Sequence, residues 1–173
     1  MKTLLHICCA PCANQPIQVL RGDGLVVTGF WYNPNIHPFT EYRARRNCLR
    51  EYAETIDLKL IERNDYGLRP FVRAVAEDIE HRCVKCYEFR LFETARQAAE
   101  GGFDSFTSSL FISPYQNDDL MREVAQRAAT NTAWNSWTGT SGPISGKVKT
   151  SPGSTASIWK NTAAASSPRK SGT

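Results

Sequence analysis

Short apolar runs alternate with helical stretches along this chain, and no other sequence feature constrains the fold as strongly. Runs typical of buried strands occupy residues 3–7, 24–32, 58–61 and 103–107. Stretches typical of helices lie between them, at 13–20, 41–55, 70–79 and 87–100. Strands that alternate with helices pair in parallel. The sequence therefore predicts an α/β fold, with a parallel sheet and helices on both faces in three layers.

Three loops of this fold are expected to form one site. In open parallel sheets, ligands bind beyond the carboxyl ends of the strands. The loop that begins at Cys8, the loop 33–38 and the segment 108–115 each follow a predicted strand. We therefore expect these three segments to converge.

The cysteines indicate what this site binds. Five of the six fall in two clusters, which are Cys8, Cys9 and Cys12, and Cys83 and Cys86. Thiolates at such spacing can turn toward one soft metal ion or one iron–sulfur cluster. The first cluster lies in a strand-to-helix loop, where the irregular backbone lets adjacent cysteines face the same ion. Cys48 stands alone in a charged helical stretch and is expected to be a free thiol.

Several readings of the cysteines compete. Too few apolar residues follow Met1 and Lys2 for a signal peptide, so a reducing cytoplasmic location is expected and structural disulfides are disfavoured. A thioredoxin-like redox pair of Cys9 and Cys12 would leave the other clustered cysteines unexplained. A zinc ion and a [4Fe–4S] cluster fit a set of four cysteines equally well, and spacing alone leaves both open.

Composition excludes some classes of protein. With 173 residues, 41% of them hydrophobic, the chain is expected to be soluble, and no apolar run approaches membrane-spanning length. The formal net charge of +4 arises in residues 131–173, which carry five basic residues and no acid. The remainder has 16 basic and 17 acidic residues, so the charge does not indicate a nucleic-acid partner.

Five blocks of residues between 2 and 127 form one ordered set. The blocks are HICCAPC at 6–12, WYNPNIHP at 31–38, Glu41 and Tyr42 with Arg45, RCVKCYEFRL at 82–91, and FTSSLFISPY at 106–115. Together they resemble the QueH family of epoxyqueuosine reductases. The approach to Cys83 departs from the family, because Glu80 and His81 stand where a glycine-containing segment is expected.

The resemblance implies a cofactor, a substrate and a fold. A [4Fe–4S] cluster would be held by four cysteines: Cys8, Cys9, Cys83 and Cys86. The enzyme would reduce epoxyqueuosine at the tRNA wobble position to queuosine, without cobalamin, using an electron-donating thiol or protein reductant. Its fold would be a three-layer α/β arrangement of the HUP-like nucleotide-hydrolase type.

Further site residues follow from the same blocks and from the chemistry. Opening an epoxide to an alkene needs two electrons, a proton donor and a dry pocket. Cys12 is a candidate ligand of a second, mononuclear iron, or lies against the substrate, and a buried thiol is the alternative. His37 is a candidate acid, or a hydrogen-bond donor that fixes its loop. The candidates for substrate binding are Tyr32, Asn33, Asn35, Arg45, Ser113 and Tyr115, although Tyr32 also suits a core position and Arg45 a solvated helix face.

Residues 131–173 differ from the rest in composition. They are rich in Ser, Thr, Gly and Ala, and carry Trp134, Trp137 and Trp159 without periodicity. We expect an irregular tail after a reductase domain of residues 1–130.

A shift of reading frame accounts for this tail. Residues 131–136 can be encoded so that reading from the third letter gives YGVEF, and residues 158–170 so that it gives MEKYCGCIFSEE. Both strings resemble the C-terminus of the QueH family, where Cys-Gly-Cys is implied to be a redox-active pair. This chain has no cysteine after Cys86, so its reductase activity is expected to be impaired.

A function of another class also stays open. A non-catalytic, zinc-stabilised RNA-binding module would use the same four cysteines and would assign the arginines to phosphate contacts. Iron and sulfide content discriminates between the two functions.

Overall fold

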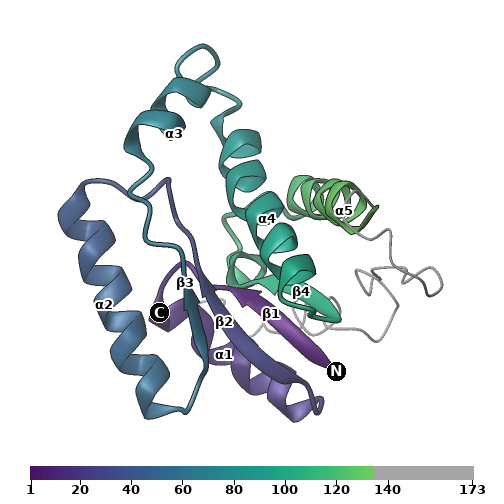
Figure 1. Cartoon of the computed structure of the whole chain (residues 1–173). Helices are drawn as coiled ribbons and strands as arrows, with labels where there is room; N and C mark the ends of the chain where they lie inside the picture. Colours follow the sequence, from purple (N-terminus) through teal and green to yellow (C-terminus); the bar gives the residue numbers. More distant parts are fainter. Residues whose placement is uncertain (135–173) are drawn as a thin grey trace, which may run out of the picture.

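A computed structural model describes residues 1–134 and shows a four-stranded parallel sheet with helices on both faces (Figure 1). The strands are β1 (Lys2–His6), β2 (Val26–Trp31), β3 (Leu60–Glu62) and β4 (Ser105–Ser108). The helices are α1 (Ala10–Gly22), α2 (Phe39–Thr55), α3 (Leu68–Val75), α4 (Arg82–Glu100), the short 3₁₀ helix η1 (Ser109–Ile112) and α5 (Asp118–Trp134). The predicted α/β class and parallel sheet are confirmed.

The strand order is β3-β2-β1-β4, with every neighbouring pair parallel. From β1 the chain steps to β2 and then to β3, and it returns through α3 and α4 to the other side of β1. Parallel crossovers are right-handed. The helices that connect strands on one side of β1 therefore cover one face of the sheet, and α4, which leads to β4 on the other side, covers the opposite face. The point of reversal lies between β1 and β4, where open α/β sheets bind ligands.

Alternation along β1 separates the two faces of the sheet. Leu5 and Ile7 join a core that includes Ile17 of α1 and Leu49 of α2. Leu4 points the other way and packs with Ala98 of α4. These side chains are at most 5% exposed, so β1 is covered on both sides, as expected for a strand inside a parallel sheet.

Three helices differ from the sequence-based expectation. Helix α3 spans Leu68–Val75 instead of residues 70–79. Helix α4 begins at Arg82 instead of residue 87, so Cys83 and Cys86 lie in its first turns; the intervening residues include neither glycine nor proline, and the helix continues through them. Helix α5 was not expected. Its Met121 and Val124 pack against Leu91 of α4, and this tertiary contact stabilises a helix of largely polar sequence.

The C-terminal boundary also differs. Helix α5 ends at Trp134, four residues beyond the predicted limit of the domain at 130. The remainder of the predicted tail, residues 135–173, lies outside the described residues. In the part of the chain that the structure describes, no helix is both long and apolar enough to cross a membrane.

Candidate metal centre

The three loops meet at the carboxyl edge of the sheet, as the sequence predicts. The amide of Cys8 donates to Ser109 Oγ at 3.2 Å, which joins the loop after β1 to the segment after β4. The Asn33 side chain, after β2, donates from Nδ2 to the Ile7 carbonyl at 2.9 Å. The contacts place one site at the point of reversal between β1 and β4.

His6 fixes the relative positions of these loops. Its Nε2 lies 3.1 Å from the Tyr32 carbonyl, which can only accept, so Nε2 carries the proton. Its Nδ1 then accepts from Ser108 Oγ at 2.9 Å. Burial, and next the positive charge of Arg90, lower the pKa of His6 to about 4, so the ring is neutral near pH 7. We did not select His6 from the sequence; its signal was a polar residue within a buried strand, two positions before Cys8.

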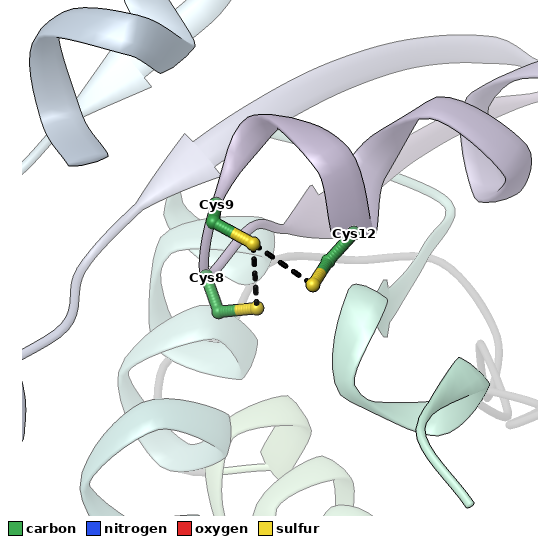
Figure 2. A group of neighbouring side chains, drawn as sticks. All are labelled: Cys8, Cys9 and Cys12. Atoms are coloured by element: carbon green, nitrogen blue, oxygen red, sulfur yellow. Dashed lines mark hydrogen bonds between the residues drawn. The ribbon is translucent and has the colours of Figure 1, made fainter.

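Three cysteine sulfurs converge beside this network (Figure 2). The Sγ atoms of Cys8 and Cys9 are 3.9 Å apart, those of Cys9 and Cys12 are 2.8 Å apart, and all three lie within 4.8 Å of one another. Cys9 is extended at the N-cap of α1, and Cys12 lies in the first turn, so the helix start brings Cys12 back toward the other two. This group could hold a metal ion.

The electrostatics of the group suit a metal. Hydrogen bonds from Cys12 and then Cys9 lower the pKa of Cys8, while the bonds to Cys8 and Cys9 raise the pKa of Cys12. These bonds therefore favour the thiolate form of Cys8 over that of Cys12. A thiolate is the form of cysteine that binds soft metals, and the neighbouring thiols become ligands as a metal displaces their protons.

Cys83 and Cys86 border the group without joining it. They lie three residues apart at the start of α4; Cys83 is exposed and Cys86 is half-buried. Burial raises the pKa of Cys86, and the positive charge of Arg90 acts against this rise. Cys8 packs against the cluster that contains Tyr87, so the two cysteine segments are adjacent. Within residues 1–134, the structure brings Cys12, rather than Cys83 or Cys86, to Cys8 and Cys9.

His37 lies in a pocket of aromatic side chains. Its Nδ1 is 3.1 Å from Tyr66 Oη, and its ring also packs against Phe71 of α3. Burial lowers the pKa of His37, which favours the neutral ring. Its Nε2 is buried and has no hydrogen-bond partner in the described part of the chain.

Two asparagine oxygens on the same loop are also buried without a hydrogen-bond partner in the described part of the chain. Asn33 Oδ1 and Asn35 Oδ1 are buried, and neither has a partner among residues 1–134. Buried polar atoms in folded proteins are nearly always hydrogen-bonded, so unpartnered atoms on one loop are candidates for contact with a polar ligand. The loop 33–38 therefore contains three such atoms, one each on Asn33, Asn35 and His37. All three residues are candidates from the sequence analysis.

The other candidates are dispersed. Tyr32 is 8% exposed, and the Arg63 guanidinium lies 4.9 Å over its ring, so little of the ring is open to a base. Arg45 forms an exposed ion pair with Glu41 at 2.6 Å. Ser113 Oγ accepts from the Tyr115 amide at 3.4 Å, while the Tyr115 side chain is 94% exposed.

Fold and site together define an α/β protein with a group of cysteines that could hold a metal ion at the carboxyl edge of a parallel sheet. The model of one family, described as epoxyqueuosine reductase QueH, matches residues 3–140. The chain belongs to the QueH family.

Curated relatives agree with this assignment. The chain is 39% identical over 115 residues to the epoxyqueuosine reductase QueH of Dehalococcoides mccartyi, covering 66% of this chain and 63% of the relative. It is 36% identical over 134 residues to the protein of the same name from Acinetobacter baylyi, covering 75% of this chain and 62% of the relative. For the Histophilus somni protein of that name the identity is 35% over 132 residues, covering 74% and 54%. The chain thus spans less than two thirds of these relatives.

Proposed function

We propose that this chain acts as an epoxyqueuosine reductase, which converts epoxyqueuosine at the tRNA wobble position into queuosine. Membership of the QueH family supports the proposal. The observation that carries it is the convergence of Cys8, Cys9 and Cys12 at the carboxyl edge of the sheet, with two further cysteines in the first turns of α4. The proposed setting is the cytoplasm, with a thiol or protein reductant as electron donor.

The proposed cofactor is a [4Fe–4S] cluster bound by Cys8, Cys9, Cys83 and Cys86, and no cobalamin is required. Four cysteines from two adjacent segments are a donor set that fits such a cluster. When bound, the cluster supplies electrons. Cys12 then remains available to a second, mononuclear iron, since its sulfur lies beside those of Cys8 and Cys9.

The residues of the loop 33–38 fit the remaining needs of the reaction. The epoxide takes up two electrons and two protons, its two C–O bonds break, and an alkene and water are formed. Because the Tyr66 hydroxyl can donate to His37 Nδ1, the neutral ring can present a proton on Nε2 to the departing oxygen. Asn33 and Asn35 can accept hydrogen bonds from the base through their free Oδ1 atoms. Contacts of the tRNA with Tyr32, Arg45, Ser113 and Tyr115 belong to the same proposal.

Metal analysis tests the cofactor. Protein purified without oxygen should be brown and contain iron and sulfide at about four each per chain, with one more iron if Cys12 binds a second metal. Colourless protein with one zinc per chain would overturn the reductase proposal and favour the zinc-stabilised RNA-binding module.

A single-turnover assay tests the reaction. The chain is first reduced chemically and then mixed with tRNA that contains epoxyqueuosine, and the nucleosides are quantified after digestion. Queuosine should form in proportion to the reduced cluster. Chemical reduction bypasses the natural electron donor, so the absence of product from fully loaded protein would contradict the assignment.

A further inference from the structure

Arg90 is a buried cation without an acidic partner. It lies on α4 and is 5% exposed. Its Nη2 donates to Cys86 Sγ at 2.9 Å and its Nε donates to the Cys86 carbonyl at 3.1 Å, while its Cζ lies 6.0 Å from the Tyr87 ring centroid. Within residues 1–134 no carboxylate is among its contacts. The only ionisable group that accepts from this guanidinium is therefore the thiol of Cys86.

Arg96, six residues later on the same helix, shows the usual arrangement. Its side chain is 45% exposed and forms ion pairs with Glu93 and Glu100. A guanidinium withdrawn from water needs a compensating negative charge, and one left unpaired is strongly destabilising. The position of Arg90 thus requires an anion at the cysteines.

The surroundings of Arg90 extend to the other cysteine segment. Its helix, α4, packs against β1, the strand that precedes Cys8. Cys8 itself packs against the cluster that contains Tyr87, the neighbour of Cys86. The helix that carries Arg90 and Cys86 is therefore close to the cysteines that follow β1.

We propose that Arg90 is a positioning residue that neutralises the negative charge of the loaded cysteine centre and holds Cys86 in place by donating to its sulfur. The proposal deepens the proposed function, because it concerns the metal group of the same site. Hydrogen bonds to ligating sulfurs and nearby positive charge stabilise the more negative, reduced state of such a centre. Arg90 therefore raises the reduction potential and slows the loss of metal.

Three variants of the loaded protein test this. Arg90→Gln removes the charge, Arg90→Lys keeps the charge but not the planar guanidinium, and Arg96→Gln is a matched control on the same helix. Relative to the unsubstituted protein, the equilibrium constant for one-electron reduction should fall at least tenfold in Arg90→Gln, a shift of about 59 mV in redox titration. Arg90→Lys should recover part of the shift, and Arg96→Gln should show none.

The rate of metal loss to a chelator is the second measurement. Arg90→Gln should lose metal at least tenfold faster than Arg96→Gln, whether the metal is iron or zinc, because a thiolate centre is anionic with either. A protein that holds zinc would refute the reductase proposal, while faster zinc loss in Arg90→Gln would still support this role of Arg90. Equal potentials or, for a zinc protein, equal rates of loss in Arg90→Gln and Arg96→Gln would overturn it.

Discussion

Substitutions of Cys83 and of Cys12 are expected to change the iron and sulfide content in different ways. Replacing Cys83 by Ala removes a proposed cluster ligand, so both iron and sulfide should fall sharply. Replacing Cys12 by Ala should remove about one iron per chain and leave sulfide unchanged, if Cys12 binds a separate ion. Both quantities can be measured by colorimetric analysis of anaerobic protein.

Cys48 provides the control for these variants. It is exposed on α2, and in the described part of the chain it lies apart from the cysteine group. Cys48→Ser should retain full iron and sulfide. Full iron content in Cys83→Ala would rule out Cys83 as a ligand.

Substitution of Ser108 is expected to lower the free energy of unfolding. Ser108→Ala removes the donor to the fully buried His6 Nδ1, which is then left without a partner. The expected loss is about 1–3 kcal/mol in the free energy of unfolding, measured by urea denaturation. Ser105→Ala, on the same strand, removes only a part-buried hydroxyl contact with Thr3 and should cost less. A cost at Ser108 no greater than at Ser105 would refute the importance of the His6 contact.

The cysteines could be selected as site residues from their spacing, whereas the contacts of His6, Ser108 and Arg90 depend on the fold. The short spacing of the cysteines in the sequence is enough to indicate metal or redox chemistry. The bond between His6 and Ser108 joins residues 102 positions apart, and it exists only because β1 and β4 pair in one register. The burial of Arg90 likewise depends on how α4 packs, which its local sequence does not reveal.

At the scale of elements, Gly67 controls how α3 meets the loop 33–38. A Cβ on Gly67 would lie 2.2 Å from Pro34 Cβ and 2.8 Å from its Cα. Gly67→Ala should therefore displace the loop and destabilise the fold by about 1–3 kcal/mol, with a loss of substrate affinity. Chemical denaturation and tRNA binding measure the two effects.

Gly22→Ala is the matched control for that substitution. Gly22 ends α1, and a Cβ there would have no neighbour within 4 Å. Its unfolding free energy should stay within about 0.5 kcal/mol of the original. Equal stability of both variants would show that the approach of Gly67 to Pro34 is not restrictive.

The four strands were predictable because apolar runs mark strands buried on both faces. Helix α5 was not predicted, because its apolar positions are few and include alanines, and its stability comes from packing on α4. The predicted start of α4 is five residues late, because the apolar positions that indicate the helix, such as Leu91 and Ala95, lie after residue 87.

At the scale of the whole molecule, the frameshift interpretation predicts that the present chain and a form with the restored frame differ in activity. Restoring the frame after about Thr130 would return the Cys-Gly-Cys pair, which is implied to pass electrons toward the cluster. With a thiol or protein reductant, turnover on epoxyqueuosine-containing tRNA should be near zero for this chain and should recover in the restored form. Steady-state formation of queuosine measures both.

A restored form with Ser in place of both cysteines tests whether the thiols themselves, rather than the rest of the restored segment, account for the recovered activity. If the thiols are what the present chain lacks, this variant should be as inactive as the present chain. Equal turnover of the present and restored forms would refute the frameshift interpretation.

The position of β1 between β2 and β4 also decides when the metal can be delivered during biosynthesis. Cys83 follows Cys8 by 75 residues, and the Ser109 hydroxyl that receives the Cys8 amide comes 101 residues later. A ribosome adds about 5–20 residues per second, so Cys8 and Cys9 are synthesised roughly 4 to 15 s before the α4 cysteines. During that interval the first thiols lack the second pair of the proposed ligand set, and β4 has not been synthesised. With that ligand set, delivery of the cluster would have to await synthesis through β4.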